Sequence, residues 1–345
     1  MTDIDRRTVL AGLASGVFLC GSRLAGRAQT SSARPHRIDV HHHFAPPAWV
    51  TAVKGRPLLQ PANTTWTPEK SLADMDRGGV ALSLVSITNP GLWFGDAPMT
   101  RQLARACNEY GATLVQDYPT RFGVFAAMPL PDVEATLAEI AYAYDTLKVD
   151  GVGLFTSYGD KWLGHPSFRP VMEELNRRKA IVHVHPTAAN CCRNLDYAPG
   201  VAPGSIEYGT DTTRAIARVL FSGTAVRYRD VRWIFSHGGG TAPFLAERLI
   251  RTPSLNKKLV ETVPNGAMAE LQRFYYDVAQ IAHPAPLAAL AKFEPASQIL
   301  WGTDYPFRFG NEYVKALAAF GFSADDLDKI DRQNALALLP RLKAG

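Results

Sequence analysis

The sequence has few cysteines and no long apolar run. Its 345 residues include four cysteines, and no two of them have the Cys-x-x-Cys spacing. A disulfide framework or a cysteine zinc site is therefore not predicted, and the adjacent Cys191 and Cys192 are expected to pack within a loop. No apolar run reaches the roughly 18 residues that a membrane-spanning helix needs, so we expect no membrane span in the mature protein.

Clusters of positive charge are scarce as well. The formal net charge is +5, with 37 Lys and Arg residues against 32 Asp and Glu residues. These residues form no basic run with interleaved aromatic side chains, so a nucleic-acid partner is not expected. Beyond residue 28 no Gly/Ser-rich or charge-rich linker interrupts the chain, and residues 29–345 are predicted to form one domain.

The first 28 residues have the composition of an export signal. Arg6 and Arg7 precede an apolar, small-residue run from Val9 to Leu19, and Gly26-Arg27-Ala28 supplies small residues suited to cleavage. This pattern predicts a twin-arginine signal peptide over residues 1–28 and export to the periplasm. The alternative is a frayed N-terminal helix.

Short apolar runs alternate with helix-like segments along the rest of the chain, and the predicted helices include Thr210–Ser222 and Thr241–Arg251. Strands are expected at Arg37–His43, Val80–Ser86, Phe122–Met128, Gly151–Phe155, Ala180–His185, Arg232–His237, Phe274–Ala279 and Gln298–Thr303. Eight such βα units predict an α/β fold, a single (β/α)8 TIM barrel with its catalytic side chains at the C-terminal ends of the strands. The Pro-rich segment Pro46–Pro68 is then an insertion after strand one, expected to form a wall of the pocket.

Three consecutive histidines in the segment HRIDVHHHFA could be a purification tag or part of a metal site. They lie in a predicted strand, where alternate side chains share a face, so His41 and His43 point the same way. Predicted strands five, six and eight end in His185, His237 and Asp304, which places His or Asp from four strands at one rim. Imidazole and carboxylate ligands suit Zn²⁺. The alternative is that each histidine only caps its strand.

Neighbouring residues refine this site. Strand four ends without a lysine that could bridge two metals, so one Zn²⁺ per chain is expected. The glycines after His237 suggest close approach of a substrate, which makes His237 the candidate for acid–base work. His183 is expected to hold His185 or a neighbour in one tautomer, and His42 to be a buried histidine packed under a helix.

The stretches HHHF, HPT, SHGGG and WGTDYPF resemble the amidohydrolase superfamily, specifically its metal-dependent decarboxylase branch, which includes aminocarboxymuconate-semialdehyde decarboxylase. Stretches such as WTPEKSLADMD and RFGVFAAMPLPD extend the resemblance over nearly the whole mature chain, and 6-methylsalicylate decarboxylase-like proteins look most similar. The resemblance implies that His41, His43, His185 and Asp304 bind one zinc and that His237 activates or orients its water.

The resemblance also implies a homodimer. In this branch an arginine eleven residues after the strand-six histidine reaches the partner's pocket, and Arg248 occupies that position here. A guanidinium suits a substrate carboxylate, although Arg248 could equally be a surface residue. A second substrate-binding arginine of the semialdehyde decarboxylase has no convincing counterpart, Arg56 being the nearest, which favours a smaller aromatic acid.

The predicted reaction is non-oxidative decarboxylation of a small, salicylate-like carboxylic acid with release of CO₂. The ring carbon takes its proton from Asp304 or from metal-bound water by way of His237, and both routes stay open. Phe307, together with Phe44, Trp93 and Phe94, is expected to border the pocket and hold the flat ring. The alternatives are a metal-dependent hydrolase of a lactone or cyclic amide, and a binding protein with an inactive site.

Overall fold

The computed structural model describes residues 36–187, 189–192, 195, 197–339 and 341. The signal peptide expected at residues 1–28 lies outside the described residues. The described residues belong to one compact unit that begins at Arg34.

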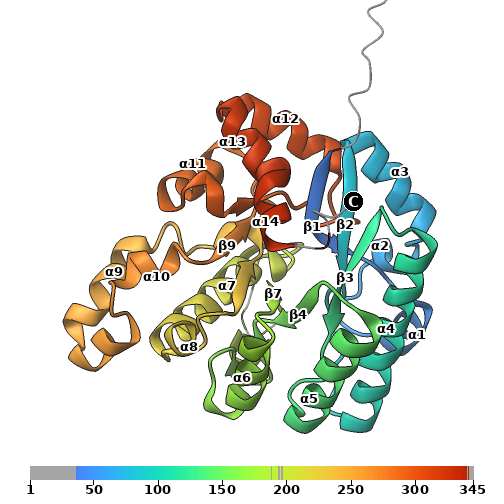
Figure 1. The fold of residues 1–345 in the computed structure, drawn as a ribbon, viewed down its shortest axis with the longest axis horizontal. Coiled ribbons are helices and arrows are strands. Elements are labelled where there is room, and N and C mark those ends of the chain that lie inside the picture. Colours follow the sequence, from blue (N-terminus) through green and yellow to red (C-terminus); the bar gives the residue numbers. More distant parts are fainter. Residues whose placement is uncertain (1–35, 188, 193–194, 196, 340, 342–345) are drawn as a thin grey trace, which may run out of the picture. The chain divides into compact units, whose positions relative to one another are not determined.

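A single parallel sheet forms the centre of this unit (Figure 1). Its strands follow one another in chain order: β1 (Arg37–His43), β2 (Val80–Ser86), β3 (Phe122–Ala127), β4 (Gly151–Phe155), β7 (Ile181–His185), β8 (Arg232–Phe235), β9 (Tyr275–Asp277) and β10 (Ile299–Leu300). Neighbouring strands need a helical crossover when they are parallel, which is why helices separate them along the chain.

The sheet closes through the residues that follow β10. The backbone N–H of Val40 donates to the carbonyl of Trp301 at 3.0 Å, and the N–H of Asp304 donates to the carbonyl of His41 at 2.8 Å. His42 also forms a parallel bridge with Tyr305. The first and last strands therefore lie side by side, and the predicted (β/α)8 barrel is confirmed.

The longer helices lie outside the sheet (Figure 1). They are α3 (Pro68–Gly78), α4 (Ala97–Asp117), α5 (Val133–Tyr142), α6 (Arg169–Arg177), α7 (Gly204–Phe221), α9 (Ala246–Leu255), α11 (Pro284–Phe293) and α12 (Gly310–Phe320). Side-chain caps fix several of their starts: Asp96 accepts a hydrogen bond from the N–H of Met99 at 2.9 Å at the start of α4. Shorter helices are α8 (Thr224–Arg227), α10 (Ala267–Leu271), α13 (Ala324–Asp328) and α14 (Asn334–Leu338).

The segment between β1 and α3 forms a wall of the barrel mouth, as predicted. It contains α1 (Pro47–Val53) and α2 (Pro61–Thr64). Trp49 of α1 is fully buried and donates its indole N–H to the carbonyl of Gly91 at 2.9 Å, which holds α1 against the loop after β2. Leu58, Leu59 and Gln60 then line the cavity at the mouth.

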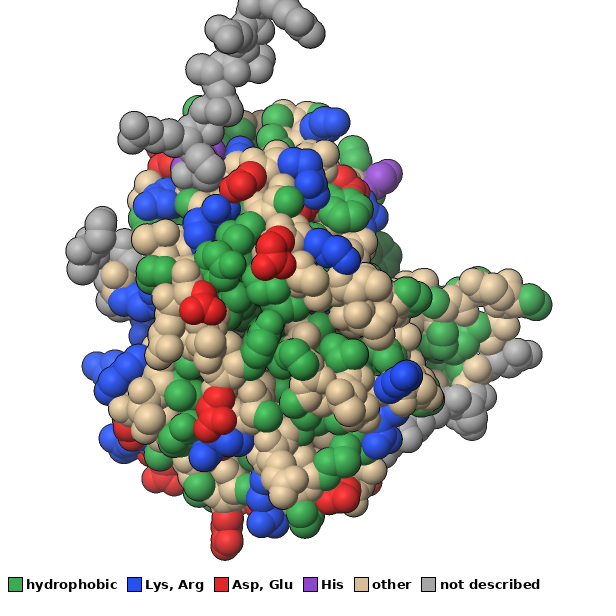
Figure 2. All heavy atoms as spheres, turned by 90° about the vertical axis from the view of Figure 1, so that its right-hand side faces the viewer, with side chains coloured by type: hydrophobic (Ala, Val, Ile, Leu, Met, Phe, Trp, Pro, Cys, Tyr) green, Lys and Arg blue, Asp and Glu red, His purple; other side chains and the backbone are tan. Residues whose placement is uncertain are grey.

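The face that carries α3 and α4 shows Lys and Arg interspersed with Asp and Glu (Figure 2). Such mixing gives no continuous positive surface on this face. Among the described helices, none combines the length and the apolar character that crossing a membrane requires.

Candidate metal centre

Four buried side chains converge at the carboxyl ends of the strands. His41 and His43 lie at the end of β1, His185 is the last residue of β7, and Asp304 follows β10. One potential ligand atom from each of the four lies within 4.8 Å of the others. The alternation of a strand explains the pair on β1, because His41 and His43 share one face.

The histidines are held with their Nε2 atoms toward the centre of the cluster. Each Nδ1 has an acceptor as its partner: Asp277 Oδ2 for His41 at 2.9 Å, the Ser86 carbonyl for His43 at 3.2 Å, and the Pro186 carbonyl for His185 at 2.8 Å. Because carbonyls and carboxylates only accept, each Nδ1 carries the proton and each Nε2 keeps its lone pair.

These lone pairs face one another. Nε2 of His41 lies 3.1 Å from Nε2 of His43, and Oδ1 of Asp304 lies 3.2 Å and 3.0 Å from these two nitrogens. Electron-rich atoms at such distances, buried from water, require a positive charge between them. The residues present therefore fit a metal ion.

The electrostatics of the cluster agree with this requirement. Burial acts to lower the pKa of His41, but the carboxylates of Asp277 and Asp304 raise the pKa to about 10. A second proton on His41 therefore supplies the positive charge when no metal ion does. Burial and the neighbouring histidines lower the pKa of His185 well below its usual value. Although burial acts to raise the pKa of Asp304, His41 and the hydrogen-bonding histidines lower this pKa well below the ordinary range. The cluster thus holds an ionised carboxylate beside a site for positive charge.

The two oxygens of Asp304 face different groups. Oδ1 faces His41 and His43, whereas Oδ2 accepts a hydrogen bond from the side-chain amide of Gln280 at 2.7 Å. Nε2 of His237 lies 3.5 Å from Oδ2 and is buried without a hydrogen-bond partner within the described residues. One carboxylate therefore joins the ion site to a histidine that is free to carry a proton.

The backbone of His237 adopts an unusual conformation that a buried carboxylate stabilises. Its φ of +56° lies in the left-handed region, and its N–H donates to Oδ1 of Asp277 at 2.9 Å. The glycines that follow serve internal packing: a Cβ on Gly239 would lie 2.8 Å from the ring of Tyr276, and one on Gly240 would collide with the carbonyl of Gly209. Close approach to α7 and β9 is thus one physical reason for these glycines. Gly240 also lines the cavity beside His237, so the predicted approach of a substrate stays a prediction.

Asp277 is a functional residue that sequence reasoning missed. This fully buried carboxylate at the end of β9 contacts His41 and the N–H of His237, and lies 3.4 Å from Nε2 of His183. Its one sequence signal is an acidic residue at the end of an apolar strand. Burial acts to raise the pKa of Asp277, yet the neighbouring His41 lowers it.

His183 and His42 have structural partners. His183 stacks on Phe125 with ring centroids 5.5 Å apart and contacts Asp277, the partner of His41. His41 is therefore the neighbour that His183 supports. His42 is buried under α3, where its Nε2 lies 3.0 Å from Oγ of Ser71, as predicted.

A comparison with protein families decides the affiliation. The amidohydrolase family model matches residues 38–341. The chain belongs to this family.

Characterised relatives of this amidohydrolase include decarboxylases. It is 37% identical to decarboxylase yanB of Aspergillus niger, over 89% of this chain and 88% of that protein. It is 34% identical to 6-methylsalicylic acid decarboxylase of Penicillium expansum, over 89% of this chain and 97% of that protein. The fold also matches the crystal structure of dihydroxybenzoic acid decarboxylase from Polaromonas, which contains bound manganese and the inhibitor 2-nitroresorcinol. The TM-score is 0.74 and the sequence identity is 20%, over 88% of this chain and 97% of that chain.

A cavity of about 910 Å³ opens above the metal centre of the amidohydrolase. His185, His237 and Asp304 lie in its wall, and Phe307 lines it with its ring centroid 5.9 Å from that of His43. Tyr208 also lines it, and burial raises the pKa of this phenol to about 12, so that its hydroxyl keeps its proton.

A second cavity of about 760 Å³ adjoins the first and shares Leu58, Pro203, Gly204 and Tyr208 with it. Trp93 and Phe94 line this second cavity. Phe44 instead packs in the core against Trp66 and Tyr110, and the prediction that it borders the pocket is wrong. Its buried neighbours on the helix side of β1 leave it no path to the cavity.

Two further sequence predictions concern the Cys191–Cys192 pair and Arg248. The structure joins the sulfurs of Cys191 and Cys192, so the pair is bonded, although a bond between adjacent residues closes no loop and makes no framework. Arg248 lies on α9 with an exposed side chain and is not among the described residues that line the catalytic cavity.

Proposed function

We propose that this amidohydrolase is a metal-dependent, non-oxidative decarboxylase of a small aromatic acid with a hydroxyl beside its carboxylate. One observation carries the proposal: Asp304 faces the ion site with one oxygen and His237 with the other. A proton carrier and a site for positive charge thus meet at a single carboxylate. The decarboxylase relatives support this choice of reaction.

Zinc is the proposed ion, one per chain. Three imidazole nitrogens and one carboxylate oxygen from His41, His43, His185 and Asp304 form a donor set typical of Zn²⁺. Manganese, which is bound in the Polaromonas decarboxylase, is the competing ion. A divalent cation held here would stabilise the negative charge of the substrate carboxylate and its neighbouring oxygen.

The cavity can hold a flat ring over these residues. The ring of Phe307 lies beside His43, and the protonated hydroxyl of Tyr208 faces the same space. The amide of Asn89 also lines the cavity, where its nitrogen donates to the carbonyl of Pro186 at 3.1 Å. Asn89 Oδ1 is buried without a partner among the described residues, so it can accept a hydrogen bond from a substrate hydroxyl.

The reaction needs a proton donor, and we assign this role to the pair His237 and Asp304. As the carboxylate leaves as CO₂, the ring carbon that bore it must gain one proton. Nε2 of His237 lies 3.5 Å from Asp304 Oδ2, and Gln280 fixes this oxygen from the other side. The pair can therefore pass one proton toward the cavity and regain it from solvent.

We further propose a homodimer in which Arg248 binds the carboxylate in the partner subunit's cavity. Arg248 has no ion-pair partner in the described part of the chain. Exposed apolar side chains flank it: Phe244 is 86% exposed and Leu255 is 77% exposed. Phe244 lies just before α9 and Leu255 at its end. Exposed apolar side chains at both ends of a helix are typical of a contact surface, and α9 would thereby bring the guanidinium to a neighbouring chain.

Measurement of CO₂ release tests the proposed function. The metal-loaded enzyme should release CO₂ from salicylate, 6-methylsalicylate or 2,6-dihydroxybenzoate and not from 3-hydroxybenzoate, whose hydroxyl lies away from the carboxylate. His283→Ala, at the exposed N-cap position before α11, is a suitable histidine control. Hydrolysis of an aromatic lactone without CO₂ release from any acid would favour the hydrolase alternative.

A further inference from the structure

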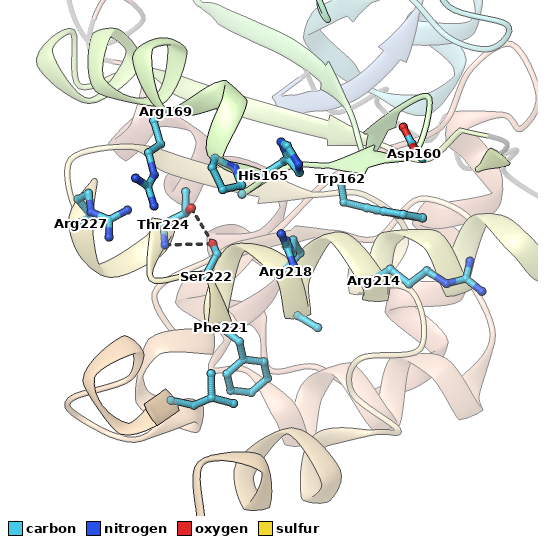
Figure 3. Close-up of a pocket in the computed structure, with 14 residues that line it drawn as sticks. Asp160, Trp162, His165, Arg169, Arg214, Arg218, Phe221, Ser222, Thr224 and Arg227 are labelled. Atoms are coloured by element: carbon cyan, nitrogen blue, oxygen red, sulfur yellow. Dashed lines mark hydrogen bonds between the residues drawn. The ribbon is translucent and has the colours of Figure 1, made fainter. Parts of the chain in front are cut away.

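A third cavity, of about 840 Å³, lies on the outer wall of the barrel. It is bounded by the loop after the hairpin strand β6 (Lys161–Trp162), by the C-terminal half of α7, and by α8 (Figure 3). It shares no lining residue with the catalytic cavity among the described residues. Its chemistry is therefore separate from that of the metal centre.

Three arginines of this cavity have no carboxylate partner among the described residues. Arg169, Arg218 and Arg227 have exposed side chains and form no ion pair in the part of the chain that the structure describes. Figure 3 shows the guanidinium groups of Arg169 and Arg227 near the hydroxyl of Thr224, whereas Asp160 lies beyond Trp162 at the opposite end. Like charges gathered in this way repel one another unless an anion lies between them.

The fourth arginine of the cavity behaves differently. Arg214 lies 3.3 Å from Oε2 of Glu207 and 3.8 Å from Oδ1 of Asp211. In Figure 3 its guanidinium points away from the other three. The positive charge available to a ligand therefore comes from the end that holds Arg227.

Hydroxyl groups lie among the three free arginines. Oγ of Ser222 lies 2.7 Å from Oγ1 of Thr224, and both line the cavity. Each hydroxyl can donate to an anion when it rotates. Guanidinium forks with neighbouring hydroxyl donors match the several oxygens of a phosphate group better than the two of a carboxylate.

The loop that leads to Arg169, the first residue of α6, is held closely against α7. Gly164 has a φ of +85°, and a Cβ there would lie 2.7 Å from Oγ of Ser222 and 3.0 Å from the carbonyl of Arg218. Trp162, on the same hairpin, donates its indole N–H to the buried Asp211 at 2.6 Å. These contacts fix the cavity wall without any ligand.

Part of the wall is apolar. Trp162, Phe221 and Leu259 form this apolar wall, and Trp162 lies on the side of Asp160 (Figure 3). A free inorganic ion would leave this wall in contact with water, whereas an organic group attached to the anion would cover it.

We propose that this cavity binds a small, soluble phosphate monoester, with the phosphate held by Arg169, Arg218 and Arg227 and the organic group against the apolar side chains that line the same cavity. The site is a binding site distinct from the metal centre. Its occupant is an aromatic or apolar ester, because the phosphate end and the apolar wall lie together in one cavity.

Calorimetric titration of the metal-loaded enzyme with phenyl phosphate and with inorganic phosphate tests the proposal. Phenyl phosphate should bind more tightly. Arg227→Gln and Arg169→Gln should each weaken its binding roughly ten- to one-hundred-fold, since each removes a charge-assisted contact. Arg227→Lys keeps the positive charge but loses the two parallel N–H donors of the guanidinium. Its affinity for phenyl phosphate should lie between those of Arg227→Gln and the unchanged enzyme. Lys315→Gln, an exposed cation on α12, is the matched control and should bind as the unchanged enzyme does.

The decarboxylation rate without phosphate should be the same in all these variants. Equal affinity for phenyl phosphate in the arginine variants and the unchanged enzyme would overturn the proposal, because binding would then reside elsewhere, such as at the metal. Equal affinity for inorganic and phenyl phosphate would contradict the role of the apolar wall. If the enzyme instead sediments with phosphatidic acid vesicles and does not bind phenyl phosphate, the arginines bind a lipid surface. That result would overturn the proposal of a soluble ligand.

Discussion

Nδ1 of His41 donates a hydrogen bond to Oδ2 of Asp277 at 2.9 Å, with both side chains fully buried. The contact joins the first strand of the barrel to the seventh, and it fixes the tautomer that turns Nε2 of His41 toward the ion site. The other oxygen of Asp277 accepts the N–H of His237. A single carboxylate thus orients both a metal ligand and the proposed proton carrier.

Asp277→Asn should therefore weaken metal binding by about ten- to one-hundred-fold while the barrel still folds. The asparagine amide would point an N–H at one of the histidine groups that now donate to Asp277. It would also lack the negative charge that favours a proton on Nδ1 of His41. Metal affinity can be measured by competition with a chelator, with circular dichroism to check folding. Glu294→Gln, which changes another buried carboxyl away from the ion site, should leave the affinity unchanged. Unaltered metal affinity in Asp277→Asn would refute the orienting role.

His237→Asn should lower kcat by about 10² to 10⁴-fold and leave metal content nearly intact, because it removes an acid–base group but none of the four proposed ligands. Asparagine is chosen because it tolerates the left-handed backbone of this position, where φ is +56°. Elemental analysis and CO₂ release should be measured on the same preparation. A parallel loss of metal and activity would make His237 a ligand instead.

Arg248→Ala should reduce kcat/KM by a factor corresponding to roughly 2 to 5 kcal/mol, without loss of metal, if its charge meets the substrate carboxylate. Mixing Arg248→Ala chains with His237→Asn chains, each nearly inactive, should restore part of the activity. In a mixed dimer one cavity combines His237 of the first chain with Arg248 of the second. Mixed dimers that form but stay inactive would show that Arg248 does not act across subunits.

The buried Glu294 should make stability depend on pH. Burial raises its pKa from 4.5 to about 9, so between these values the unfolded chain ionises while the folded chain keeps its proton. Stability contributed by this group is then lost as pH rises, at up to roughly 1.4 kcal/mol per pH unit. In Glu294→Gln the free energy of unfolding should decrease less as pH rises, and at pH 8 the variant should have a higher Tm than the unchanged protein. Glu270→Gln, which breaks the 3.0 Å ion pair with Arg229, should instead melt lower. Identical pH profiles with and without Glu294 would contradict this assignment.

Replacing Arg6 and Arg7 together with lysine should keep the precursor inside the cell, if residues 1–28 direct export of the folded protein by a twin-arginine route. Cell fractionation followed by immunodetection measures the outcome. A variant with Arg23 and Arg27 changed to lysine keeps the same charge and should still be exported. Export of the Arg6 and Arg7 variant at the normal rate would exclude this route.

The sequence predicted the barrel and the ligand set because both depend on local patterns. Strand periodicity places His41 and His43 on one face, and the rule that parallel strands end at one rim brings His185 and Asp304 to them. Asp277 escaped prediction because its partner His41 lies 236 residues away, and nothing local marks that pairing.

Helix boundaries were predicted less well for a related reason. A helix was expected to begin at Thr241, but α9 begins at Ala246 because the left-handed glycines 238–240 and the turn after them come first. The helix expected from Thr210 begins earlier, at Gly204. In both cases contacts between distant segments decide where the helix begins, as with the approach of Gly240 to Gly209.

The closure of the barrel has a consequence for biosynthesis. His41 and His43 lie near the start of the described chain and Asp304 near its end, yet the N–H of Asp304 donates to the carbonyl of His41 at 2.8 Å. A nascent polypeptide that stops before Asp304 holds the β1 histidines without their carboxylate or their neighbouring strand. Complete coordination of the ion therefore awaits translation of nearly the whole chain, and the order of synthesis itself delays full metal loading until the barrel can close.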